Sequence, residues 1–210
     1  VMVHATHTHS GPATRVYSGW GAPDEPYNEI LPYRIARACI EAVDDLAPAE
    51  LAHAEVPCEG LGVNREWDEF RPDINESLRD DWRPARPELT DTTCHVLRIQ
   101  REGRPGGFAS YFGCHPVIGG PENRKIHGDY AGGATNMVER LHPGLTGLFL
   151  QGCQGDVNVA ATCCEGDETM RALDVVAARY ARSLLHGLEI ARPLHVDGIV
   201  MAGDTCAVAV

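Results

Sequence analysis

Apolar residues recur along the chain at helical spacing in three segments. From about Glu29 to Leu46, and again from Glu168 to Ile190, they return every three or four residues, which predicts two amphipathic helices. A shorter helix is expected from Tyr130 to about Leu141, with Asp129 as its N-cap. Pro32 is compatible with the first of these helices only in its first turn.

Short runs of apolar and β-branched residues predict the strands. The expected strands are Val1–Thr6, Leu51–Val56, Thr93–Gln100, Phe108–Cys114, Leu145–Leu150 and His195–Ala202. A glycine-rich turn joins the third and fourth into a hairpin, and the polar, proline-containing residues 65–91 predict a long surface excursion. Strands alternating with helices, with one hairpin, predict an α/β fold: a mixed β-sheet with flanking helices.

Composition and charge exclude several classes of protein. With 43% hydrophobic and 23% charged residues the 210-residue chain has globular composition, and no apolar run approaches the length of a membrane span. The formal net charge of −12 argues against a nucleic-acid partner. The eight cysteines contain no Cys-x-x-Cys pair and are expected to be mostly reduced, which favours a reducing compartment. Because strand-like residues stand at both ends, the chain is expected to be part of a longer protein.

Four polar residues could carry chemistry. His7 and His9 are two residues apart, so in an extended chain both face one side and could form half of a zinc site. His115 follows a different strand, and Arg65 follows a turn where its guanidinium could orient a carboxylate or carbonyl. Taken singly, each is more often an ordinary surface or core residue, so both interpretations stay open at this point.

Five short stretches contain or accompany these residues, and their order along the chain makes a functional role for the residues more specific. They are Ala5–Pro12 (ATHTHSGP), Gly62–Arg65 (GVNR), Cys114–Val117 (CHPV), Gly128–Gly132 (GDYAG) and Gly152–Asn158 (GCQGDVN). This series resembles the neutral/alkaline, non-lysosomal ceramidase family. The first stretch is the most specific, and the resemblance runs through about residues 1–160.

The resemblance implies a zinc-containing α/β hydrolase and gives roles to particular residues. It places zinc ligands at His7 and His115, and it places His9 and Arg65 where the family lines its active site. Asn158 stands where the family has a serine implicated in catalysis, and is expected to contact the substrate as a neutral donor.

The resemblance also leaves the zinc site incomplete. The family's other two ligands, a Glu and a Tyr, lie downstream of these residues. Glu122 and Asp129 follow His115 and could substitute for them, but Asp129 is expected to serve as a helix cap instead.

The expected protein is therefore a zinc-dependent hydrolase of the neutral ceramidase type. Residues 1–210 would form part of one catalytic domain that cleaves an amide bond in a ceramide-like lipid or a related substrate. Two alternatives stay open: a non-catalytic or truncated member that binds without turnover, and a zinc hydrolase acting on a small polar amide or ester. The expected partner is thus a lipid or small-molecule substrate, and the resemblance permits secretion.

Overall fold

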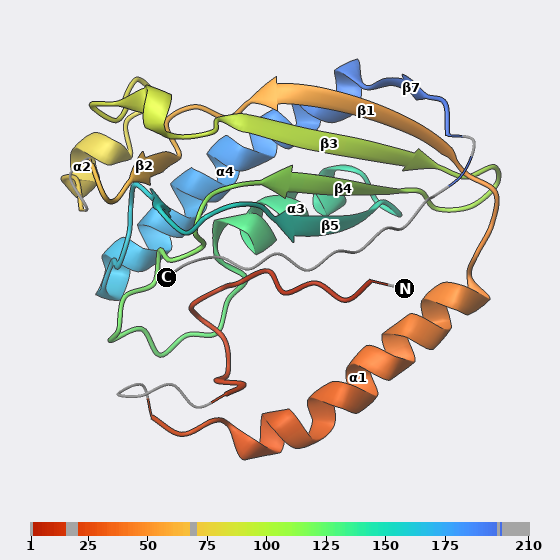
Figure 1. The fold of residues 1–210 in the computed structure, drawn as a ribbon, viewed down its shortest axis with the longest axis horizontal. Coiled ribbons are helices and arrows are strands. Elements are labelled where there is room, and N and C mark those ends of the chain that lie inside the picture. The colour runs from red at the N-terminus through yellow and green to blue at the C-terminus, as the bar shows by residue number, and fades with distance from the viewer. Residues whose placement is uncertain (1, 16–20, 68–70, 197, 199–210) are drawn as a thin grey trace, which may run out of the picture.

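The computed structural model describes residues 2–15, 21–67, 71–196 and 198, and within them one mixed sheet is covered by two helices on one face (Figure 1). The five strands run in the order β5-β4-β3-β1-β7. Their bounds are β5 (Thr146–Gln151), β4 (Gly107–Phe112), β3 (Thr93–Gln100), β1 (Glu50–Pro57) and β7 (Arg192–Leu194). Only β4 and β5 are parallel, and β3 and β4 form the expected hairpin. The predicted α/β fold with a mixed sheet is confirmed.

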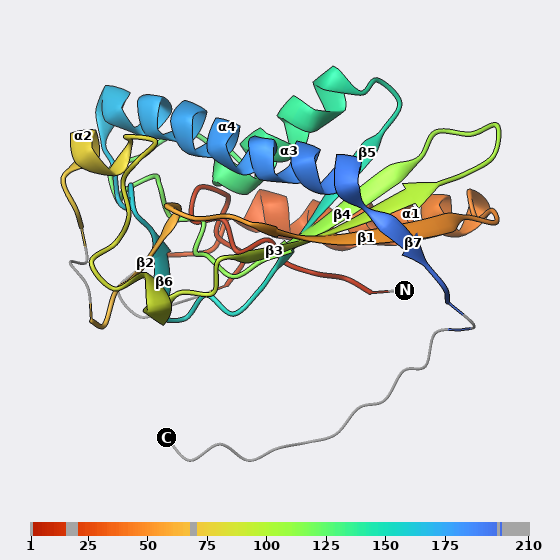
Figure 2. The same cartoon turned by 90° about the horizontal axis from the view of Figure 1, so that it is seen from above.

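The core lies between the sheet and the helices α3 (Asp129–Leu141) and α4 (Gly166–Ile190), which share one side of the sheet in Figure 2. Alternate residues of the strands are buried there, because successive side chains of a strand point to opposite faces. Aromatic rings from β4, β5 and both helices meet with centroids 5.4–6.2 Å apart: Phe112, Phe149, Tyr130 and Tyr180. Edge-to-face and stacked contacts of this kind add to the stabilisation from apolar burial.

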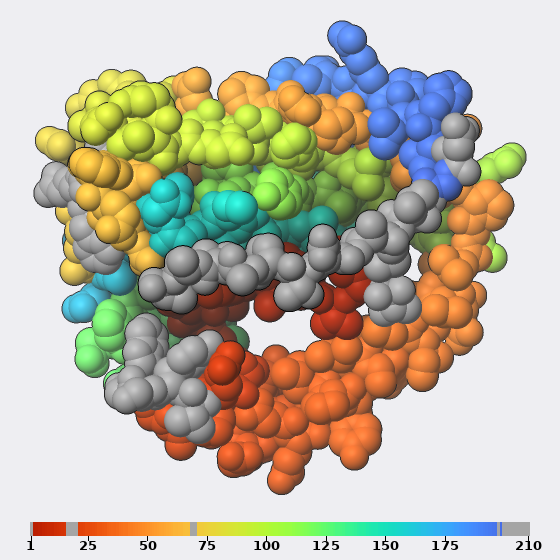
Figure 3. Space-filling view, viewed as in Figure 1, coloured from red at the N-terminus to blue at the C-terminus, as the bar shows by residue number. Residues whose placement is uncertain are grey.

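Helix α1 (Glu25–Asp44) is separate from this core, and none of its residues is buried. The space-filling view shows an open gap between α1 and the N-terminal segment (Figure 3). The predicted start at Glu29 is wrong, because Asp24 caps the helix by accepting from the backbone N–H of Tyr27. Pro32 consequently lies inside the helix rather than in its first turn. No helix of the described residues is long and apolar enough to cross a membrane.

Several expected strands differ from the structure. Residues 2–6 form no strand, because their backbone does not join the sheet. The strand predicted at His195–Ala202 is wrong at its start, because β7 ends at Leu194 and residues 195 and 196 are not in a strand. Most of the remaining predicted range lies outside the described residues. Conversely, β2 (Gly62–Asn64) and β6 (Val157–Val159) pair in a second small sheet that periodicity did not predict. Three residues are too few to display an alternating pattern.

The expected excursion after Arg65 is partly built into the fold. It contains the short helices α2 (Ile74–Ser77) and η1 (Pro87–Leu89), and Leu78 is buried in the core. The N-cap of α3 is Gly128, so the prediction of Asp129 as the cap is wrong by one residue. Asp129 is the first helical residue and has a positive φ of 56°.

Candidate functional site

Three histidines cluster in space, and they include both of the predicted zinc ligands. The Nε2 atoms of His7 and His115 lie 3.0 Å apart, although 108 residues separate them in sequence. His9 joins them, and the three donor nitrogens all lie within 4.8 Å of one another. The expected proximity of His7 and His115 is confirmed, whereas their role as metal ligands stays a prediction.

Backbone hydrogen bonds hold the N-terminal segment in place. The N–H of His9 donates to the carbonyl of Pro116 over 3.2 Å, and the N–H of His127 donates to the carbonyl of Ser10 over 3.0 Å. His7 has a φ of 62°, in the left-handed region that non-glycine residues rarely adopt. The two histidines therefore reach one centre through a turn and not through the expected extended strand. Strained backbone of this kind is frequent at functional sites.

His4 lies outside the histidine cluster. Its Nε2 accepts a hydrogen bond from the backbone N–H of Gln151 over 2.7 Å. His4 therefore helps to dock the N-terminal segment against the end of β5 and takes no part in the histidine cluster.

The two-stranded sheet brings the other motifs to the same place. Asn158 of β6 pairs with Val63 of β2, and on its other side it forms a parallel bridge with His115. The N–H of His115 donates to the carbonyl of Val157 over 2.9 Å, and the N–H of Arg65 donates to the carbonyl of Asp156 over 2.8 Å. Main-chain pairing thus unites residues 62–65, 114–117 and 152–158 in one site.

The electrostatics of the cluster favour neutral imidazoles. Burial and, to a smaller extent, charges on His7, His9 and Arg65 together lower the pKa of His115 to about 4, against the opposing effect of a hydrogen bond to Gln154. Burial, with charges on His7 and Arg65, also lowers the pKa of His9. Neutral imidazole is the form that binds a metal ion.

The donor chemistry of the cluster fits a zinc ion. The carbonyl of Gln154 can only accept, so the Nδ1 of His115, 2.9 Å away, is the protonated nitrogen. This leaves the Nε2 lone pair of His115 free to face His7, which is the arrangement that metal-binding histidines use. Zinc accepts imidazole nitrogens at about 2.0–2.1 Å, which places two such nitrogens about 3.3 Å apart. Among the described residues the cluster contains no carboxylate.

Arg65 and Asn158 border the cluster in different ways. The Arg65 side chain is 36% exposed, and its charge acts on both His9 and His115, so it is not turned to the opposite face of the molecule. Asn158 is buried beside His115, and its Oδ1 has no hydrogen-bond partner among the described residues. The catalytic and substrate-binding roles expected of His9, Arg65 and Asn158 stay predictions.

The two carboxylates considered as substitute ligands are used elsewhere. Asp129 accepts from the backbone N–H groups of Ile118 and Tyr130, as expected of a group that binds backbone and not metal. Glu122 is exposed and pairs with Arg124 at 3.6 Å.

Sequence reasoning missed the main-chain contacts that hold the site. The carbonyls of Gln154 and Pro116 orient His115 and His9, and His127 contributes through its backbone. Backbone groups have no residue signature, so no pattern in the sequence identifies them.

Comparisons with known proteins identify the family and the fold. The family model described as "Neutral/alkaline non-lysosomal ceramidase, N-terminal" matches residues 1–178. A solved structure titled "Ceramidase complexed with C2" superposes with a TM-score of 0.71 at 20% identity, covering 90% of this chain and 30% of that chain. The neutral ceramidase from Pseudomonas aeruginosa gives a TM-score of 0.69 at 20% identity, covering 90% and 31%. No protein of curated function matches in sequence.

These comparisons differ in what they establish. At 20% identity the solved structures show the fold alone, and the chain spans about three tenths of their length. The family model covers well over half of the chain and contains all the motifs that converge on the histidine cluster. The chain belongs to the neutral/alkaline non-lysosomal ceramidase family, through that family's N-terminal region.

Proposed function

We propose that this chain is the N-terminal part of a zinc-dependent hydrolase of the neutral ceramidase type, cleaving an amide bond in a ceramide-like lipid or a related substrate. The observation that carries the proposal is the 3.0 Å approach of His7 and His115, with His9 completing the cluster. Membership of the ceramidase family supports hydrolase chemistry.

Zinc would be held by the Nε2 atoms of His7 and His115. When bound, the ion supplies a Lewis acid and a source of nucleophilic water near neutral pH. The chain's own contribution to binding is to keep the imidazole of His115 neutral and to fix its tautomer through Gln154.

His9 and Arg65 would act on the substrate. Because burial and neighbouring charges keep His9 neutral, its imidazole can accept a proton near the reacting carbonyl and return it to the departing amine. Arg65, on the rim of the cluster, can orient the carbonyl oxygen and stabilise the negative charge that develops on it. The Asn158 side-chain amide would donate a hydrogen bond where the family has a hydroxyl, but it cannot act as a nucleophile.

One observation favours a second candidate, a family member that binds without turnover. Asn158 replaces the serine of the family motif, and the described residues add no carboxylate to the three histidines. The two candidates differ in turnover and agree on metal binding, so affinity and hydrolysis have to be measured separately.

The test is a zinc titration in competition with a chelating dye. At the cluster of His7, His9 and His115 we expect weak binding in the 210-residue chain and one bound equivalent in a chain extended to include the family's Glu and Tyr. His7→Ala and His115→Ala should each abolish tight binding of the equivalent at the cluster, whereas His195→Ala, an exposed histidine outside the cluster, should leave it unchanged. Unchanged zinc affinity in both cluster variants would exclude these residues as ligands.

Fatty-acid release from ceramide by the extended chain then separates the two candidates. Release that depends on His9 and Arg65 supports the hydrolase. Zinc binding with no release, together with release gained in Asn158→Ser, would support the member without turnover and would identify the missing hydroxyl as its cause.

A further inference from the structure

A second group of metal-binding side chains lies on the sheet face that α3 and α4 do not cover. In β1 the buried residues Ala52, Ala54 and Val56 face the helices, so His53 and Glu55 project from the opposite face. On the neighbouring strand β3, His95 is the register partner of Glu55. Three side chains of types that suit zinc, two imidazoles and a carboxylate, therefore share one small patch of the open face.

The spacing of these donors is close to that of a tetrahedral metal site. The Nε2 of His53 lies 3.2 Å from the Nδ1 of His95, which lies 3.7 Å from the Oε1 of Glu55. All three donor atoms fall within 4.8 Å of one another. Ligands at about 2.0–2.1 Å from zinc stand about 3.3 Å apart, so only small side-chain movements are needed.

The backbone beneath the patch is held firmly. β1 and β3 pair without interruption from Glu50 opposite Gln100 to Pro57 opposite Thr93. The rings of His53 and His95 are stacked, with an interplanar angle of 15° and centroids 5.4 Å apart. A site built on regular strands loses little conformational entropy when its ligand binds.

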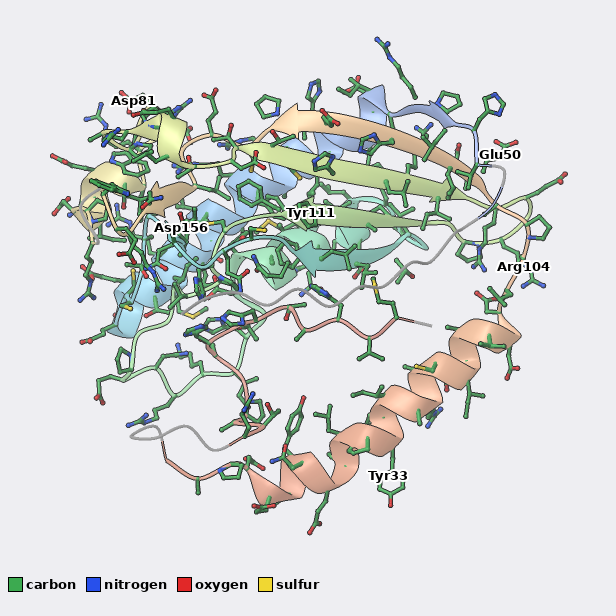
Figure 4. All side chains as sticks on the ribbon, in the orientation of Figure 1. Tyr33, Glu50, Asp81, Arg104, Tyr111 and Asp156 are labelled. Atoms are coloured by element: carbon green, nitrogen blue, oxygen red, sulfur yellow. The ribbon has the colours of Figure 1, made fainter. Side chains whose placement is uncertain are left out.

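Tyr111 of β4 stands beside the patch. It is the register partner of His95, and its ring meets the imidazole edge-on at a centroid distance of 5.8 Å. In Figure 4 Tyr111 lies on the sheet, away from the N-terminal segment. The ring shields one side of His95, while the Glu55 side chain remains 63% exposed and keeps the patch accessible to solvent.

We propose that His53, Glu55 and His95 form a second divalent-metal site, suited to zinc, with its remaining coordination open to water or to a further ligand. Two histidines and one carboxylate form a frequent donor set for zinc with an open position. The site shares no residue with the cluster of His7, His9 and His115 and does not rest on the proposed function. The competing interpretation is an ordinary cross-strand contact between two histidines and a glutamate.

The experiment uses Zn²⁺ alone as the probe, added to the 210-residue chain carrying His7→Ala and His115→Ala. Dye competition should find one equivalent of zinc still bound. Adding His53→Ala or His95→Ala should weaken that binding by more than about tenfold. Glu55→Gln should weaken it as well, while His195→Ala is the matched control. Absence of bound zinc in the double variant, or equal binding with and without His53→Ala, would overturn the site.

A second measurement does not depend on the variants folding. Histidine ring ¹⁵N shifts of the unsubstituted chain should change for His53 and His95 on addition of zinc, because coordination fixes one nitrogen of each ring. Unchanged shifts for both rings would overturn the proposal. In the chain extended to include the family's Glu and Tyr, zinc-induced shifts here without shifts at His7 and His115 would count against the proposed function alone, and the reverse result against this site alone.

Discussion

Arg179 shows how one buried side chain organises a long connection. It projects from α4, is only 8% exposed, and donates to the carbonyls of Gly60, Ser77 and Arg79. Gly60 precedes the segment that the sequence predicts as a surface excursion, and Ser77 and Arg79 lie within it. A charged donor of this kind is worth more than a neutral one, and its removal leaves buried acceptors unpaired.

Arg179→Met is therefore expected to lower the free energy of unfolding by about 2–4 kcal/mol. Arg182 on the same helix is the matched control, since its ion pair with Asp80 at 3.1 Å is exposed. Arg182→Met should cost less than about 1 kcal/mol. Urea denaturation of both variants measures the difference, and equal losses would contradict a special role for Arg179.

Asp129 carries a buried carboxyl whose ionisation opposes folding. Burial raises its pKa from 3.8 to about 6, although hydrogen bonds from Tyr130 and Ile118 lower it. Between these pH values the folded chain binds more protons at this group than the unfolded chain does. The free energy of unfolding therefore falls as pH rises from about 4 to 6.

We expect this fall to reach about 3 kcal/mol for Asp129, because the pKa differs by about two units. Asp129→Asn is neutral throughout and should lack that part of the pH dependence. Unfolding by urea at pH 4 and pH 7, for both proteins, isolates the contribution because all other groups are shared. Parallel pH profiles would show that Asp129 does not titrate in this range.

At the scale of elements, the contact between α3 and α4 depends on one of two adjacent glycines of α3. A Cβ added at Gly133 would lie 2.8 Å from the Cβ of Ala177, whereas one added at Gly132 would meet nothing within 4 Å. Gly133 therefore permits the close approach of the two helices. Gly132 offers no such contact and only reduces helix propensity.

Alanine substitutions at the two glycines should consequently change the free energy of unfolding in opposite directions. Gly132→Ala is expected to stabilise the protein by about 0.5–1 kcal/mol. Gly133→Ala is expected to destabilise it by about 1–3 kcal/mol, because the helices must separate to admit the methyl group. Thermal unfolding of both variants measures the effects, and each variant serves as the control for the other. A change of the unfolding temperature in the same direction for both would contradict this packing.

The elements also show what the sequence could predict. Periodicity located β1, β3 and β5 to within a residue or two, and it located α4 because its apolar stripe is long and faces a core. It missed β2 and β6, whose three residues carry no period. It placed a strand before His7 because the residue types suit one, although the hydrogen bonds of His9 and Ser10 go to loops near Pro116 and His127.

At the scale of the whole molecule, the candidate site is an assembly of segments far apart in sequence. Spacing alone leaves His115 and Arg65 indistinguishable from surface residues. Only the ordered set of motifs, through its family resemblance, predicted that His115 would meet His7. The hydrogen bond from the His9 N–H to the Pro116 carbonyl supplies the physical reason, and the pairing of β2 with β6 brings Arg65 to the same site. Those tertiary contacts have no local signal.

The helices α1 and α4 differ in how much tertiary packing stabilises them. Helix α1 buries none of its 20 residues, and apolar side chains such as Tyr33 and Ile40 are exposed along it. Pro32 removes one of its internal hydrogen-bond donors. An isolated helix of this length is marginal in water, whereas α4 is packed on the sheet along much of its length.

Amide hydrogen exchange of the 210-residue chain should therefore separate the two helices. Amides of α1 are expected to show protection factors below about 100, because they open locally, while those of α4 open only with global unfolding. Pro32→Ala restores a donor and should raise protection in α1 without changing that of α4. Exchange measured by mass spectrometry on peptides from each helix checks both statements. Equal protection of α1 and α4 in the unsubstituted chain would contradict this prediction. It would mean that α1 unfolds only together with the core, although none of its residues is buried.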